Sequence, residues 1–199
     1  MTTNRSRNPR GHGDLLREEI LRAAIDLIDE TDDAAALTLR GIARRAGISA
    51  PAIYAHFADL PKLIDAMLAK SFTQLATAVQ NAIEREAEPD RQLIVAGDAY
   101  VRFGQTHPAR YGVMFAAEGY AQNAVQTFVL VSQSLQRCID VGLSASTNPR
   151  DDVWMVWAAL HGIATLRKPA RADYLRLGTL DRAALLETTI RRIARLTPG

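Results

Sequence analysis

A short segment near the N-terminus holds the residues with the clearest chemical potential. It reads LTLRGIARRAGISAPAIYAHF and covers residues 37–57. Arginines, hydroxyl groups and aromatic rings alternate here with small apolar residues. Arginine and hydroxyl side chains are groups that bind phosphate oxygens, and a slim helix can enter a DNA groove about 12 Å wide. This composition favours recognition of a nucleic acid.

Two short helices are predicted in this segment. Thr38 can cap a helix over residues 39–46, and Gly47 can end it because glycine adopts positive φ without strain. Ser49 can cap a second helix that runs to about His56, with Pro51 in its first turn, where a missing N–H costs nothing. Two capped helices joined at a glycine turn are typical of a helix-turn-helix.

The overall charge hides a local pattern. The chain has 199 residues, 24 basic and 22 acidic, for a net charge of +2. Residues 1–13 hold three arginines and no acid, residues 14–37 hold two arginines and eight acids, and residues 38–62 hold four basic side chains and one acid. Two basic stretches are therefore separated by an acidic one, and the second coincides with the predicted helix-turn-helix.

Helical periodicity continues along the rest of the chain. Asp14 is a plausible N-cap for a first helix, and the apolar stripe from Leu60 to Ile83 predicts a long helix that ends before Pro89. No period-two run of β-branched residues is evident, so we expect an all-α fold with about nine helices. The later helices are predicted over residues 91–105, 109–117, 122–141, 151–166 and 181–196.

Composition excludes several classes of protein. The single cysteine, Cys138, cannot form an intramolecular disulfide, and the chain lacks the roughly 20 consecutive apolar residues that span a bilayer. We therefore expect a cytoplasmic protein. We predict no metal and no cofactor, and no HExxH, phosphate-binding glycine loop or nucleophile elbow supports an enzyme.

The segment resembles the N-terminal domain of the TetR family of transcriptional regulators. The threonine cap, the AG turn, the tyrosine and the His-Phe pair match over residues 20 to about 68. The resemblance implies three regions: a flexible basic arm over residues 1–13, a DNA-binding helix-turn-helix over 14–59, and a ligand-binding and dimerisation domain over 60–199. It also implies a homodimer that binds a double-stranded operator.

The same resemblance assigns candidate DNA contacts. Thr38 and Arg40 would touch the sugar-phosphate backbone, and Tyr54 with His56 would reach phosphates or base edges. Where the family usually has a lysine, this chain has Leu60, and Lys62 can take over its phosphate contact. The residues that would lie at the groove are Ser49, Ala50, Pro51 and Ala52.

The predicted recognition helix lacks arginine, lysine, asparagine and glutamine. Bidentate recognition of guanine or adenine is therefore not expected from it, and specificity would depend on thymine methyl groups and DNA shape. Structural roles remain open for the larger side chains. Tyr54 and Phe57 can serve as core aromatics, His56 can be a packed residue, and Arg44 with Arg45 can form a solvated helix face.

A second resemblance concerns the C-terminal half. The segments YVRFGQTHPARYGVMFA and WAALHG, the latter at residues 157–162, are similar to the TetR ligand-binding domain named for its Trp-His-Gly motif. Few charges interrupt this region, which favours an apolar or aromatic effector. Ordinary core packing is the alternative role for most of these side chains. The candidate ligand-binding residues are Tyr100, Phe103, His107, Tyr111, Met114, Phe115, Phe128, Trp157 and His161.

Together these features predict a ligand-responsive DNA-binding regulator, a repressor released from a palindromic operator by a small molecule. The family pairs its last two helices with those of a second copy, which implies residues 151–166 and 181–196 here. Two alternative functions are less well supported. A helical enzyme using His107, Cys138, Trp157 or His161 lacks a supporting motif, and the capped basic helices argue against an interaction module that does not bind DNA.

Overall fold

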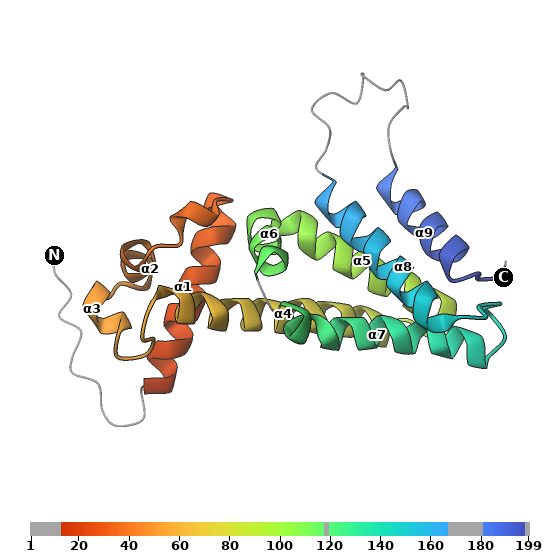
Figure 1. Ribbon diagram of the computed structural model, residues 1–199, viewed down its shortest axis with the longest axis horizontal. Coiled ribbons are helices and arrows are strands. Elements are labelled where there is room, and N and C mark those ends of the chain that lie inside the picture. The colour runs from red at the N-terminus through yellow and green to blue at the C-terminus, as the bar shows by residue number, and fades with distance from the viewer. Residues whose placement is uncertain (1–12, 118–119, 167–180, 198–199) are drawn as a thin grey trace, which may run out of the picture. The chain divides into compact units, whose positions relative to one another are not determined.

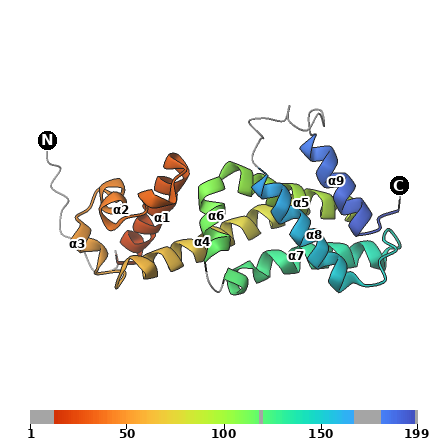
Figure 2. The same cartoon turned by 45° about the horizontal axis from the view of Figure 1, so that its top comes forward.

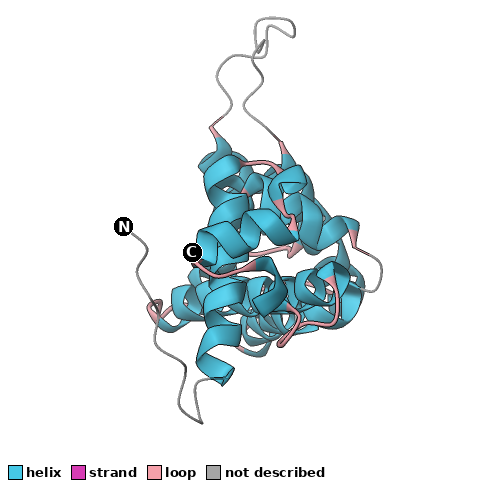
Figure 3. Cartoon of the chain, turned by 90° about the vertical axis from the view of Figure 1, so that its left-hand side faces the viewer, coloured by secondary structure: helices cyan, strands magenta, loops and turns pink. Residues whose placement is uncertain are grey.

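The computed structural model describes residues 13–117, 120–166 and 181–197. Over these residues the protein is helical, as predicted, with nine α-helices, one short 3-10 helix and a single isolated bridge between Ser144 and Leu196 (Figures 1 and 3). The chain divides into two compact units, residues 1–70 and residues 71–199. None of the helices in the described ranges is long and apolar enough to cross a membrane.

The first unit is a small helical bundle whose apolar residues face inward. The buried side chains include Ile20 and Ile28 of the first helix, Ile42 of the second and Ile53 of the third, all without solvent exposure. The long helix α4 begins in this unit and ends in the second. The elements are α1 (Gly13–Thr31), η1 (Ala34–Ala36), α2 (Leu39–Ala46), α3 (Ala50–Ile53) and α4 (Leu60–Glu84).

The second unit is built around α5, which packs against α7, α8 and α9 (Figures 1 and 2). Gly97 allows this close packing, since a Cβ there would lie 2.6 Å from Cδ1 of Ile190 and 3.0 Å from Cδ2 of Leu160. The core of this unit therefore requires a residue without a side chain at the centre of α5. Its helices are α5 (Pro89–Thr106), α6 (Pro108–Ala116), α7 (Tyr120–Asp140), α8 (Pro149–Thr165) and α9 (Arg182–Ile193).

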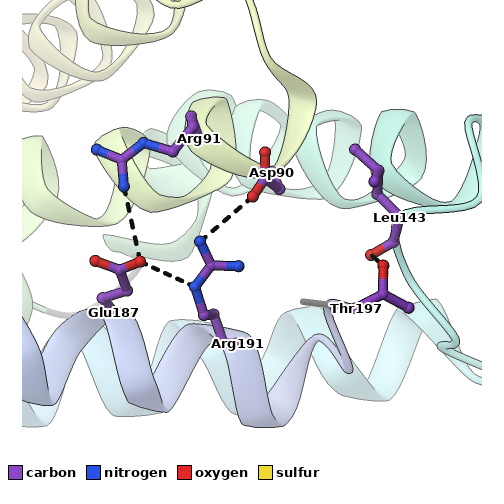
Figure 4. Close-up of polar contacts among 6 residues, drawn as sticks. All are labelled: Asp90, Arg91, Leu143, Glu187, Arg191 and Thr197. Atoms are coloured by element: carbon purple, nitrogen blue, oxygen red, sulfur yellow. Dashed lines mark hydrogen bonds and ion pairs between the residues drawn. The ribbon is translucent and has the colours of Figure 1, made fainter. Parts of the chain in front are cut away.

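Ion pairs attach α9 to the start of α5 (Figure 4). Arg191 donates from Nε to Glu187 at 2.9 Å and lies 3.4 Å from Asp90, while Arg91 lies 3.7 Å from Glu187. Because these side chains are partly solvated, each pair contributes only a fraction of a kcal/mol, about 0.2–1. Burial of Leu186 and Ile190 on the inner side of α9 contributes more to its packing than these pairs do.

Side chains cap several helix ends, and the predicted cap at Thr38 is among them. The Thr38 hydroxyl accepts from the Gly41 N–H at 3.0 Å, Asp59 accepts from Lys62 at 2.8 Å, and Asp181 caps α9. Gly47 adopts the left-handed conformation with φ +69°, as expected.

Three local predictions were wrong. Asp14 is not an N-cap, because α1 already includes Gly13, and the Ser49 side chain makes no capping hydrogen bond at the start of α3. The α3 helix ends at Ile53 and not near His56. After Ile53 the chain forms a turn, in which the Tyr54 N–H donates to the Pro51 carbonyl and the His56 N–H donates to the Ile53 carbonyl.

Replacing Gly47 tests how strongly its backbone conformation holds the turn. Among the described residues no atom lies within 4 Å of a Cβ built there, so we expect the cost of Gly47→Ala to be conformational and not steric. We expect the free energy of unfolding to fall by about 1–2 kcal/mol, and by less in Gly47→Asn because asparagine tolerates positive φ. Urea unfolding followed by circular dichroism measures both, and equal losses in the two variants would contradict this account.

Candidate nucleic-acid interface and effector site

The turn between α2 and α3 is held by backbone hydrogen bonds around Gly47. The Gly47 N–H donates to Arg44 at 3.3 Å, and the Ile48 N–H reaches back to Ala43 at 3.0 Å. These bonds satisfy carbonyls at the end of α2, which the helix itself leaves without partners. The left-handed glycine therefore both ends α2 and sets the direction in which α3 begins.

The two helices bury one side and expose the other. Phe57 is buried, which agrees with the predicted role of a core aromatic. The Arg17 guanidinium lies 4.9 Å from the centre of the Phe57 ring. Tyr54 is 56% exposed, so it is not a core aromatic. Of the other predicted DNA contacts, Ala50, Ala52 and His56 are half-buried, and the exposed ones are Thr38, Arg40, Ser49, Pro51 and Lys62.

The acidic face of α1 neutralises part of the basic stretch. Arg45 pairs with Glu30 and lies 3.6 Å from Asp26. Lys70 hydrogen-bonds to Glu18 and thereby lowers the pKa of that carboxyl below its usual value. The cations that pack against α1 are thus already partnered within the first unit.

Two arginines remain on the exposed side. Arg40 and Arg44 make no ion pair with any residue that the structure describes, whereas Lys62 lies 3.6 Å from Asp65. Arg44 is the residue that sequence reasoning did not select as a DNA contact. The sequence carries no signal that separates it from Arg45, because the difference lies in which of them meets the acids of α1.

Most of the predicted ligand-binding residues form one aromatic cluster in the second unit. The Tyr111 hydroxyl lies 2.8 Å from the Tyr100 hydroxyl and 2.7 Å from Nδ1 of His161. Phe115 packs on Tyr111 with ring centres 4.6 Å apart, and Trp157 lies 5.0 Å from Tyr100. Burial raises the pKa of Tyr111 and lowers that of His161, which favours a neutral hydrogen-bonded chain.

Part of this cluster lies in the core, since Tyr100 and Met114 have no exposed surface, whereas Phe115 and His161 are half-buried. The Phe128 ring centre lies 4.7 Å from that of Trp154 and 5.7 Å from that of Trp157. A groove with a volume of about 590 Å³ lies between the second half of α4 and α5. Of the nine predicted ligand-binding residues, Phe103 and His107 line this groove.

Cys138, one of the residues considered for an enzyme, lies in the core of the second unit. Cys138 is fully buried, and burial raises the pKa of its thiol to about 11, so little of the nucleophilic thiolate exists at neutral pH. Among the described residues no three histidine, cysteine or carboxylate side chains gather where they could hold a metal ion.

Two family models match the chain. The model described as tetracyclin repressor-like, C-terminal domain matches residues 93–193, and the model for bacterial regulatory proteins of the tetR family matches residues 20–67. The first match alone spans half of the chain. The chain belongs to the TetR family. At the level of the family, this confirms the prediction of a ligand-responsive, DNA-binding transcriptional regulator, whereas the Trp-His-Gly subtype stays a prediction.

Individual relatives are distant. The nucleoid occlusion factor SlmA of Vibrio campbellii is 21% identical over 129 residues, which cover 62% of this chain and 66% of that protein. The chain thus matches about two thirds of the length of this relative. A solved protein of unknown function from Rhodococcus sp. RHA1 is 25% identical, with a TM-score of 0.76 and coverage of 96% of this chain and 100% of that one.

Further solved structures share the fold at lower identity. A TetR-like transcriptional regulator from Rhodococcus sp. RHA1 is 20% identical, with a TM-score of 0.62 and coverage of 94% and 97% of the two chains. The regulator RolR, solved in complex with resorcinol, is 13% identical, with a TM-score of 0.67 and coverage of 95% and 92%.

The ion pairs of the first unit predict different effects for two neighbouring arginines. Arg40→Gln should weaken DNA binding about equally for all sequences and reduce the slope of log affinity against log salt by about 1, because one phosphate contact is lost. Arg45→Gln removes the same charge from a side chain that is already paired with α1, so its slope should stay near that of the unmodified protein. Fluorescence anisotropy over a salt series measures both slopes, and equal changes would contradict the assignment.

Titration of His161 should make stability depend on pH. Because its pKa is lowered in the folded protein, the unfolded chain binds more protons between that value and the ordinary value near 6.5. This contribution to stability is complete above pH 6.5 and declines as the pH falls below it. His161→Asn, which retains a partner for Tyr111 but does not titrate, should flatten the decline in melting temperature. An identical pH profile in the variant would contradict this prediction.

Proposed function

We propose that this TetR family member is a homodimeric repressor that binds a palindromic operator with one helix-turn-helix per half-site. A small-molecule effector would release it. The observation that carries this proposal is the exposed side of α2 and the turn after α3, where Arg40 and Arg44 make no ion pair with the described residues and Tyr54 is solvated. Such groups are available to phosphates without first breaking an interaction inside the protein.

Each predicted contact has a distinct role in this proposal. Arg40 and Arg44 neutralise phosphates and position the protein, as does the Thr38 region at the start of α2. The small residues Ser49, Ala50, Pro51 and Ala52 let α3 approach the floor of the major groove. Because they offer no bidentate donors, sequence would be selected through thymine methyl groups and groove shape, with Tyr54, His56 and Lys62 anchoring the flanks.

The proposal assigns DNA binding to residues 14–59 and effector binding and dimerisation to residues 60–199, with residues 1–13 as a basic arm. Residues 1–12 of this arm lie outside the described residues. A Trp-His-Gly type of C-terminal domain is part of the same proposal, with Trp157 and His161 beside Tyr100 and Tyr111. Because the partner is genomic DNA, the proposed location is the cytoplasm.

The exposed side of α8 supports the proposed homodimer. Trp154 and Met155 are 55% and 50% exposed, Ala158 is also exposed, and no atom of the described residues lies within 4 Å of a Cβ built at Gly162. Large exposed apolar side chains beside small residues suit close packing with another helix. The inward residues Val153, Val156 and Leu160 are instead buried in the core of the chain itself.

Effector binding is proposed to act through α4. This helix is continuous from Leu60 to Glu84, so a change in its tilt would alter the separation of the two recognition helices in the dimer. Two half-sites fit a dimer only when their centres lie about 34–36 Å apart or at a multiple of that distance. A modest tilt would therefore be enough to lower operator affinity.

Selection of genomic DNA fragments by the purified protein tests the DNA-binding proposal. We expect an inverted repeat whose half-site centres are separated by about one helical turn or a multiple of it, with affinity that falls steeply as salt rises. Enrichment of a single unrepeated half-site would contradict the dimer. Binding without sequence preference would contradict the proposal that the protein recognises a specific operator.

A matched pair of α8 variants tests the dimer in parallel. Met155→Asp places an uncompensated charge on the proposed interface, and should shift the mass measured by light scattering from dimer towards monomer and weaken operator binding at least about tenfold. Arg150→Asp alters an exposed residue near the start of the same helix and serves as the control. Equal dimer fractions in both variants would place the interface elsewhere.

A further inference from the structure

A groove between α4 and α5 has the size and lining of a small-molecule site. Its volume of about 590 Å³ lies within the range of about 300–1,000 Å³ that ligand pockets occupy. The connection between the two helices is only four residues long, so they run antiparallel and face each other along the groove. Ala78, Ala82, Val95, Ala99 and Phe103 form an apolar floor.

The groove exists because the facing residues are small. Ala78 and Ala82 lie four residues apart on α4, and Val95 and Ala99 lie four residues apart on α5, so each pair projects from one side of its helix. Larger side chains at these positions would close the space between the helices. Ala78 and Arg85 are seven residues apart, which corresponds to about 10 Å along the helix.

Phe103 closes the apolar part of the groove. Its ring packs against His107, with ring centres 5.0 Å apart, and the buried Arg110 guanidinium lies 5.0 Å from its centre. Arg110 also donates to Gln74 of α4 at 2.7 Å. These contacts hold the ring in place, so this end of the groove is preformed.

The charged residues of the lining differ in their partners. Asp98 pairs with Arg102, and the Glu86 carboxylate accepts a hydrogen bond from the Ala87 N–H at 3.1 Å. Arg85 is exposed and makes no ion pair with any described residue. Both acids of the lining therefore already accept hydrogen bonds, whereas the Arg85 guanidinium is available to bind an anion.

We propose that this groove binds an amphipathic monocarboxylate with an apolar body about 10 Å long, such as a straight-chain acid of medium length. The body would lie over the alanines towards Phe103, and the carboxylate would pair with Arg85. A guanidinium binds a carboxylate through two parallel hydrogen bonds, which also fixes the direction in which the ligand enters. The regulatory consequence, release of DNA, rests on the proposed function; binding itself does not.

Calorimetry with a matched set of probes tests the site. Decanoate should bind the full-length protein, and decanol and decylamine, which have the same chain but no carboxylate, should bind about tenfold more weakly or worse. Arg85→Gln should weaken decanoate binding about tenfold, while Arg150→Gln, an exposed arginine of α8, should leave it unchanged. Ala82→Phe and Ala99→Phe should each abolish binding by filling the groove, with circular dichroism confirming that both variants fold.

The outcomes separate this inference from the proposed function. Equal affinity for decanoate and decylamine, or unchanged decanoate binding in Arg85→Gln and Ala99→Phe, would overturn the site. Absence of decanoate binding in a protein that still binds its operator would overturn it too. If decanoate binds as expected but leaves operator affinity unchanged, the site stands and release by this ligand is contradicted.

Discussion

The left-handed backbone of Gly47 is the constraint on which the first unit depends. It ends α2 after eight residues and directs the chain into α3, so that Ile42 and Ile53 meet in the core while Tyr54 stays in solvent. A residue with a Cβ would adopt this φ only with strain. The exposed side of the helix-turn-helix is therefore a consequence of one backbone angle together with the apolar residues that pack beneath it.

On this framework, ion pairs determine which charges face outward. The acids of α1 hold Arg45 and Lys70, whereas Arg40 and Arg44 form no ion pair within the described part of the chain. Phosphate binding by the latter two requires no internal ion pair to break, whereas an exposed pair such as that of Lys62 must rearrange. The net charge of +2 does not reveal this division, because it counts paired and unpaired cations alike.

Local signals explain what the sequence predicts well. The Thr38 cap, the glycine at position 47 and the apolar stripes act over one helical turn, so they can be recognised without knowing the fold. The difference between Arg44 and Arg45 depends on a helix that lies about 15 residues earlier in the chain. No local pattern contains that information.

The candidate effector residues show the same limit. The resemblance to TetR ligand-binding domains selected Tyr100, Tyr111 and Trp157 as candidates, and their rings lie close together, but residue types alone cannot distinguish rings that line a cavity from rings that pack in the core. The floor of the groove between α4 and α5 consists largely of alanines, and nothing in the sequence marks these alanines as ligand-binding residues. At Gly162 no atom of the described residues lies within 4 Å of a built Cβ, which leaves room there for the proposed second copy.

The most direct test of the division between paired and unpaired arginines is a nuclear magnetic resonance titration of the arginine Nε–H signals with operator DNA. The account predicts that the signals of Arg40 and Arg44 shift as DNA is added, while that of Arg45 stays in place because Glu30 and Asp26 hold its side chain. A shift of the Arg45 signal with no change at Arg40 and Arg44 would contradict it.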